Sequence, residues 1–286
     1  PSSSGFTTYY DNQGKNENKE LTLDFRSVLL RNDNWYVSIA ANLSSQKGKM
    51  KKISESLKAY NDLVDEYLSD ATNKAEWSKP LSKYEEGQSL TAIWGMRSLG
   101  IDPANGKELF LNRDGNISYD WTALNTQVIG DKEPKARGTI SLNLSYKGLS
   151  VYAGFRYEFG GDEYNQTLVD KVEDANLKFT NADKRVFTDR WREVGQVARF
   201  KALKDTFDDP TRSTSRFVQK NNFMELASLD IEYDFSNHAW MKKTFLSTFQ
   251  IGVSMADIWR VSSIKQERGL NYPFANQVNF TLRLGF

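Results

Sequence analysis

The end of the sequence alternates without interruption between apolar and polar residues. From Val278 to Phe286 every even position is apolar, and the odd positions hold Asn279, Thr281, Arg283 and Gly285. Successive side chains of a β-strand point to opposite faces, so this pattern predicts a strand with one apolar and one polar face. Such a strand fits either a soluble β-sandwich or the wall of an outer-membrane β-barrel that ends on an aromatic residue.

The same alternation recurs upstream, in segments close to the length that a tilted strand needs to cross a bilayer. One of them changes phase near Ser27, where a β-bulge would shift the pattern. A weaker candidate strand is Ser3–Tyr10, which brings the expected number of strands to eight. The clear segments are Leu21–Leu30, Trp35–Leu43, Ile140–Tyr146, Leu149–Phe159, Phe223–Phe235 and Phe245–Met255.

Charged residues occupy the polar faces of several of these segments. In a barrel these residues would line a hydrated lumen. A lumen accounts for the carboxylates that alternate along one strand, so they need not be interpreted as the catalytic pair of a glycosidase. The residues expected to face the lumen are Arg156, Glu158, Asp230, Glu232 and Arg283.

The connections between the predicted strands alternate in length. Short turns are expected at residues 31–34, 147–148 and 236–243, and long loops at approximately 44–138, 161–221 and 256–277. Outer-membrane barrels sort their connections in this way, with short periplasmic turns and long extracellular loops. A soluble sandwich has no reason to do so. The loop pattern therefore favours an all-β, transmembrane antiparallel barrel whose C-terminus is periplasmic.

Composition narrows the possible functions. The chain has 286 residues, no cysteine and a formal net charge of +1, which gives no support for a nucleic-acid partner. Without cysteine there are no disulfides and no thiolate metal sites. The chain has a single histidine, His238, and this argues against a histidine-based catalytic site or metal site within it. We predict no enzyme activity, no cofactor and no metal site.

The first residues contain no signal peptide and read as a turn. Loops of this size would be unusual on a barrel of only eight strands. We therefore expect residues 1–286 to be the C-terminal part of a larger barrel, with the preceding strands absent.

A series of short motifs supports this expectation. The motifs are Gly100–Leu111, Asn112–Gly115, Val128–Lys135, Ser145–Ser150, Phe159–Asn165, Asn181–Val186, Arg190-Trp191 and Ser215–Val218. In order and spacing, from about Gly87 to Phe286, they resemble the C-terminal half of SusC-like TonB-dependent outer-membrane transporters, while residues 1–86 fit more loosely. The chain departs from many members at Val194-Gly195-Gln196, where those members have Pro-Gly-Asp.

The resemblance implies a barrel of twenty-two strands, of which this chain would supply about the last eight. It also implies a plug and a TonB-binding segment, both absent here, and a location in the cell outer membrane among membrane lipids. The implied partner is a SusD-like lipoprotein, arranged as a dimer of SusC–SusD-type pairs. The implied substrate is an oligosaccharide, or in some members a peptide. A soluble β-rich protein that binds ligands with its loops remains the alternative from another class.

Two loop segments are candidates for substrate binding. Tyr119, Asp120 and Trp121 follow a predicted hairpin around Asp114-Gly115, and they would form either a sugar-binding platform or the packing of a large loop. Asp162, Tyr164 and Asn165 follow Gly160-Gly161, and they would face the substrate cavity or anchor a loop.

Other loop residues are expected to be structural. The spacing of apolar residues across Lys51–Leu68 predicts a short helix within a loop. We expect Arg190-Trp191 and Ser215–Phe217 to pack and to pair with loop carboxylates rather than to bind substrate.

Overall fold

The computed structural model describes residue 12 and residues 14–178, 183–203, 210–264 and 277–286. The chain divides into two compact units, each described by itself. The sheet unit comprises residues 20–46, 134–161 and 220–286, and the loop unit comprises residues 1–19, 47–133 and 162–219.

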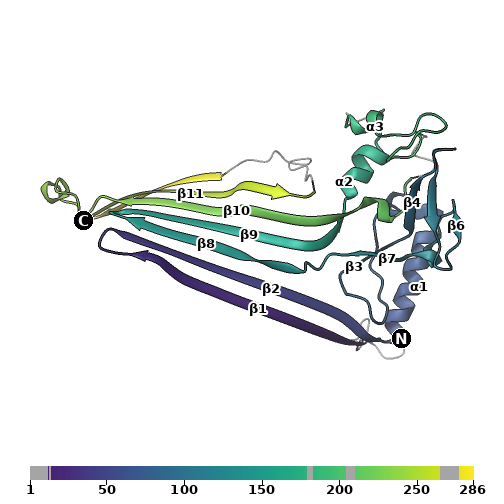
Figure 1. The fold of residues 1–286 in the computed structure, drawn as a ribbon, viewed down its shortest axis with the longest axis horizontal. Helices are drawn as coiled ribbons and strands as arrows, with labels where there is room; N and C mark the ends of the chain where they lie inside the picture. The colour runs from purple at the N-terminus through teal and green to yellow at the C-terminus, as the bar shows by residue number, and fades with distance from the viewer. Residues whose placement is uncertain (1–11, 13, 179–182, 204–209, 265–276) are drawn as a thin grey trace, which may run out of the picture. The chain divides into compact units, whose positions relative to one another are not determined.

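The largest sheet has seven strands in the order β1-β2-β8-β9-β10-β11-β12 (Figure 1). All seven clear strands of the sequence prediction are present, and the eighth candidate, Ser3–Tyr10, lies outside the described residues. The predicted all-β, antiparallel character is confirmed. The strands are β1 (Gly14–Arg31), β2 (Trp35–Ile53), β8 (Ala136–Tyr146), β9 (Leu149–Tyr164), β10 (Val218–Asp234), β11 (Thr248–Ser262) and β12 (Gln277–Gly285).

Several strands run further than the alternation predicted. Strand β2 continues to Ile53, ten residues past the expected end at Leu43, although residues 44–52 are mostly polar. Strand β1 extends beside it, and the Lys51 ammonium lies 2.8 Å from a Glu17 carboxylate oxygen. Backbone pairing and polar cross-strand contacts hold this part of the hairpin together, so its sequence needs no apolar face.

Strand β11 contains a β-bulge. Its register with β10 shifts between Leu226 and Ser228, so that one additional residue of β11 is accommodated there. Asp257 has a φ of 50°, which marks the irregular position.

The connections at one end of the sheet are shorter than those at the other. Lys147 (φ 44°) and Gly148 (φ 93°) form a two-residue hairpin turn, and Asn32 Oδ1 accepts hydrogen bonds from the backbone of Asn34 and Trp35 in another turn. The end of β12 lies beside this edge, because Gly285 pairs with Thr248 at the start of β11. The predicted sorting of connections is therefore a property of the sheet.

Apolar side chains remain exposed on the edge strands of this sheet. Leu21 of β1 is 56% exposed, and Phe280 of β12 is 80% exposed. A soluble sandwich would cover such residues with a second sheet. The sheet unit contains one sheet among the described residues, so the pattern is that of a lipid-facing wall.

The loop unit contains two small sheets and several short helices. Strand β3 (Ala92–Gly95) pairs with β7 (Gln127–Asp131), and β5 (Glu108–Leu111) pairs with both β4 (Arg97–Ile101) and β6 (Ile117–Ser118). The predicted hairpin is confirmed, because Phe110 pairs with Ser118 and Leu111 with Ile117. The short helices are η2 (Ala71–Glu76), η3 (Ala123–Asn125), α2 (Gln166–Leu168), η4 (Val169–Glu173), α3 (Arg185–Thr188) and η5 (Ser215–Phe217), and η6 (Met241–Lys243) belongs to the sheet unit.

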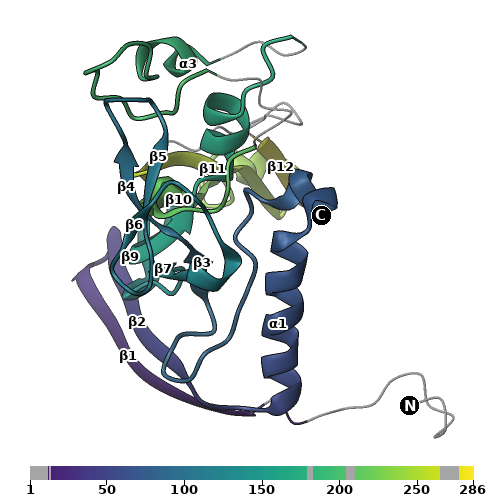
Figure 2. The same ribbon diagram turned by 90° about the vertical axis from the view of Figure 1, so that its right-hand side faces the viewer.

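The predicted loop helix is α1 (Glu55–Ser69), shown in Figure 2. Ser54 caps its first turn by accepting a hydrogen bond from the backbone of Leu57. Leu57, Val64 and Leu68 are buried on one side, as the spacing predicted. The predicted start at Lys51 was wrong, because residues 51–53 belong to β2, and Tyr60 is exposed rather than buried. No helix among the described residues is long and apolar enough to cross a membrane.

Candidate ligand pocket

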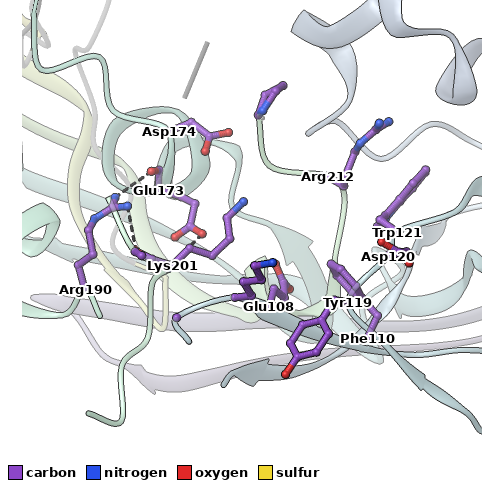
Figure 3. A pocket seen from close by; sticks show the side chains of 14 residues that line it. Glu108, Phe110, Tyr119, Asp120, Trp121, Glu173, Asp174, Arg190, Lys201 and Arg212 are labelled. Atoms are coloured by element: carbon purple, nitrogen blue, oxygen red, sulfur yellow. Dashed lines mark hydrogen bonds between the residues drawn. The ribbon is translucent and has the colours of Figure 1, made fainter. Parts of the chain in front are cut away.

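The loop unit contains a pocket of about 330 Å³. It is bordered by the β5–β6 hairpin and by the segments around residues 173, 190, 201 and 212 (Figure 3). The side chains labelled there are Glu108, Phe110, Tyr119, Asp120, Trp121, Glu173, Asp174, Arg190, Lys201 and Arg212. The pocket thus combines aromatic rings with charged groups of both signs.

The aromatic side of the pocket is held in place by hydrogen bonds. The Tyr119 hydroxyl donates to Asp102 Oδ2 at 2.5 Å and accepts from Asn105 Nδ2 at 3.0 Å. The Trp121 indole donates to the Ser213 carbonyl at 3.1 Å, and the Arg212 guanidinium lies 5.0 Å from the Trp121 ring centre. Rings fixed in this way present flat apolar faces without further loss of side-chain entropy on binding.

Behind the pocket, Arg216 joins two buried carboxylates. Its Nη2 lies 2.8 Å from Glu108 Oε2 and 2.8 Å from Glu173 Oε1. Burial alone would raise the pKa of Glu108, but the charge and hydrogen bond of Arg216 hold that pKa below its ordinary value. Burial would likewise lower the pKa of Arg216, and the two carboxylates raise it instead. Glu108 and Arg216 are therefore both charged near neutral pH.

Arg190 fastens several segments of the pocket wall to one another. Its guanidinium donates to the backbone carbonyls of Val172, Glu173, Val186 and Lys201. Burial lowers the pKa of Arg190, although the nearby Glu173 charge opposes this effect. Because its donors are occupied by carbonyls, Arg190 shapes the pocket rather than offering hydrogen bonds to a ligand.

Trp191 is also structural, in agreement with the sequence interpretation. Its indole donates to the Pro103 carbonyl at 2.9 Å. Gly106 packs beneath the ring, and a Cβ atom at this position would lie only 2.4 Å from Trp191 Cε3. The Gly106 φ of 72° independently favours glycine.

Three polar groups at the pocket retain hydrogen-bonding capacity. Glu108 Oε1 is buried and has no hydrogen-bond partner of normal geometry among the described residues. The Lys201 ammonium lies close enough to lower the pKa values of both Glu108 and Asp174, while burial dominates and raises the pKa of Asp174. Within the described part of the chain, neither this ammonium nor the Asp120 carboxylate forms an ion pair. The pocket can therefore both accept and donate hydrogen bonds.

The structure brings together only the first of the two predicted substrate-binding segments. Tyr119, Asp120 and Trp121 all border the pocket. In the second segment, Asp162 accepts from the Asp131 backbone at 3.1 Å, and buried Tyr164 packs 5.9 Å from the Phe217 ring. Asn165 caps α2 and donates to Gln219, so all three residues make the contacts of a loop anchor. Their binding of substrate stays a prediction.

The residues expected to face the lumen lie on strands of the sheet. Arg156 contacts Glu225 at 2.7 Å, and Arg283 donates to Gln250 at 2.7 Å. Glu158 is opposite Arg137, Asp230 is opposite Ser254 and Glu232 is opposite Gly252. Directly opposed residues share one face of an antiparallel pair. That this face lines a lumen stays a prediction.

Sequence reasoning missed several of the residues that build the pocket. Glu173 ends the short helix η4, and Lys201 and Arg212 come from loop segments without strand or helix periodicity. Only tertiary structure places these three residues beside the β5–β6 hairpin. Glu225 was missed for another reason, because it falls among the apolar positions of β10, where it pairs with Arg156 and Arg260.

No protein-family model matches the chain. It is 24% identical over 272 residues to TonB-dependent receptor P3 of Formosa agariphila, a match that covers 89% of this chain and 25% of the relative. The predicted resemblance to TonB-dependent transporters is confirmed. The similarity to a TonB-dependent receptor agrees with the predicted outer-membrane location and with the prediction that the chain is not an enzyme.

Solved structures show the same fold. The RagAB peptide importer in the open-open state matches 100% of this chain and 30% of its own, with a TM-score of 0.73 and 20% identity. The RagAB peptide transporter matches 93% of this chain and 28% of its own, with a TM-score of 0.68 and 20% identity. The chain thus spans between a quarter and a third of the length of these relatives.

Proposed function

We propose that the chain is a barrel portion of an outer-membrane transporter that imports oligosaccharides with energy supplied through TonB. The polar faces of the strands form part of the lumen wall, and the loops after β2, β9 and β11 are extracellular. The observation that carries the substrate assignment is the pocket formed around Trp121, Lys201 and Glu108.

The chemistry of this pocket suits a sugar ring. Trp121 and Phe110 offer apolar faces for the C–H face of a sugar, and Glu108 Oε1 and Asp120 are acceptors for hydroxyl groups. The Lys201 ammonium is a donor, so one hydroxyl-rich ring meets both kinds of partner. The cavity volume of about 330 Å³ lies at the lower end of the range of small-molecule sites and accommodates one or two sugar rings.

A SusD-like lipoprotein is the proposed partner, in a dimer of SusC–SusD-type pairs. Helix α1 supports an external partner because Tyr60, Leu63 and Tyr67 form an exposed apolar stripe with helical spacing. Leu63 is 63% exposed, and acidic residues Asp62 and Glu66 flank the stripe. A partner with an apolar surface and basic residues at its edge would complement it.

A peptide is the second candidate substrate. The structural relatives are named as a peptide importer and a peptide transporter, and the pocket contains a cation and an anion that suit the two termini of a short peptide. A peptide would rely on ion pairs to Lys201 and Asp120, whereas a neutral sugar would rely on stacking and on hydroxyl hydrogen bonds.

Binding of ligands to the purified transporter in detergent distinguishes these two substrates. Isothermal titration with a panel of neutral oligosaccharides and a panel of mixed short peptides should give saturable binding for at least one oligosaccharide. Trp121→Ala should weaken that binding, while Tyr36→Ala, a change at a residue of β2 that does not line the pocket, should not. Binding of peptides alone would replace the oligosaccharide assignment with the peptide one.

A further inference from the structure

The connection between β10 and β11 has a fixed shape at the end of the sheet where the short turns lie. The Phe235 and Phe249 ring centres are 5.1 Å apart, and Trp240 packs edge-on against Phe249 at 5.9 Å. The Tyr233 hydroxyl lies 3.1 Å from His238 Nε2. Together with buried Met241, this cluster holds the short helix η6 (Met241–Lys243) in position.

The outer surface of this connection is both aromatic and basic. Phe245 and Phe286 are 81% and 82% exposed, and their rings stack in parallel with centres 5.7 Å apart. Trp240 is 45% exposed. Lys242 and Lys243 are also exposed, and neither forms an ion pair within the described residues. Exposed aromatic rings beside lysines are the combination that favours the boundary between lipid tails and headgroups.

The surrounding charges strengthen the positive character of this region. The neighbouring turns contain two basic residues, Arg31 and Lys147, and one acidic residue, Asp33. Asp234 is the carboxylate nearest along β10, and it accepts hydrogen bonds from Ser236 and Gln250. The two lysines of η6 therefore face solvent without a neutralising carboxylate of their own.

We propose that the β10–β11 connection is a binding site for an anionic phospholipid headgroup in the membrane. Trp240, Phe245 and Phe286 enter the boundary of the lipid tails, and Lys242 and Lys243 contact the headgroup phosphate. The site is independent of the transported substrate, and it requires only that the strands cross a membrane. Each lysine near an anionic membrane surface strengthens binding by about fivefold.

Native mass spectrometry of the purified transporter in detergent tests this site. The protein is offered equal amounts of phosphatidylglycerol and phosphatidylcholine, and the retained lipids are counted. The wild type should retain phosphatidylglycerol preferentially. The double variant Lys242→Gln/Lys243→Gln should lose most of that preference, with phosphatidylglycerol binding weakened about 25-fold. Lys15→Gln/Lys52→Gln, which changes two exposed lysines at the start of β1 and the end of β2, should retain it.

Two results would overturn the proposal. One is equal retention of the two lipids by the wild type. The other is an unchanged preference in the Lys242→Gln/Lys243→Gln variant. As a second measurement, Phe245→Ser should weaken retention of both lipids, because the ring acts through the lipid tails rather than through headgroup charge. Inorganic phosphate and phosphatidylcholine vesicles are also tested as competitors of bound phosphatidylglycerol. If inorganic phosphate displaced the phosphatidylglycerol and the vesicles did not, the site would be one for free phosphate and the lipid assignment would be wrong.

Discussion

Arg216 Nη2 lies 2.8 Å from Glu108 Oε2, although 108 residues separate the two in the chain. This contact connects the β5–β6 hairpin to the segment that precedes β10. Glu173 joins from a third segment, so that one guanidinium holds three parts of the loop unit together. The walls of the ligand pocket depend on this arrangement.

Removing the charge of Arg216 should destabilise the loop unit strongly. Arg216→Ala would leave the buried Glu108 and Glu173 carboxylates without their partner, a loss of about 3–5 kcal/mol. Thermal unfolding in detergent, followed by intrinsic tryptophan fluorescence, measures the effect. Arg97→Ala, a change at an exposed position of β4, serves as the control and should shift the midpoint little. Equal midpoints for the two variants would contradict this role of Arg216.

The same ion pairs predict a dependence on acid pH. The pKa of Glu108 is below its ordinary value of 4.5 in the folded protein, so its contribution to stability is present above pH 4.5. That contribution is lost as the pH falls through the lower, folded-state pKa. The thermal unfolding temperature of the wild type should therefore decrease when the pH is lowered below 4.5, and this decrease should be smaller in Glu108→Gln. The same pH profile for both proteins would be evidence against a charged Glu108.

A methyl group at Gly106 should disturb the pocket, whereas one at Gly115 should not. Both glycines have positive φ, but a Cβ atom at Gly106 would overlap the Trp191 ring, and one at Gly115 meets nothing within 4 Å. Gly115→Ala therefore reports backbone strain alone, which costs about 1 kcal/mol. Gly106→Ala should cost more and lower ligand affinity as well. The comparison is made by unfolding and titration on both variants, and equal effects would exclude the steric argument.

The pocket residues should separate by their contribution to ligand binding. Trp121→Ala removes a stacking surface and should weaken binding of an oligosaccharide about tenfold or more. Lys201→Gln keeps a hydrogen-bond donor and should weaken binding of a neutral sugar only a few fold, while binding of a peptide carboxylate would fall much more. Calorimetric titration of both variants gives these ratios, and a larger loss for Lys201→Gln than for Trp121→Ala would favour a peptide.

The strands were predictable from sequence because alternation of apolar and polar residues is a local property. The same holds for the hairpin at Asp114-Gly115 and for α1, where turn residues and helical spacing are read directly. The polar end of β2 was missed because alternation stops there, and the end of β11 was missed because the β-bulge at Asp257 shifts its phase. The ends persist because their backbones are paired, a property that the side-chain pattern does not report.

The pocket was only partly predictable. Tyr119, Asp120 and Trp121 were found because aromatic and acidic residues stand together in the sequence. Lys201 and Arg212 approach them through long-range contacts that local patterns do not report. For Tyr164 the sequence left substrate binding and loop anchoring open, and the structure shows its packing against Phe217, a long-range contact that the local pattern does not report.

Uptake of a labelled oligosaccharide by intact cells tests the central proposal most directly. Cells with the wild-type transporter should accumulate the label, and the accumulation should disappear when TonB is removed. It should also fall sharply in Trp121→Ala expressed at the same level in the outer membrane. Accumulation that is unaffected by both changes, or uptake of labelled peptides alone across the panel, would contradict oligosaccharide import through this pocket.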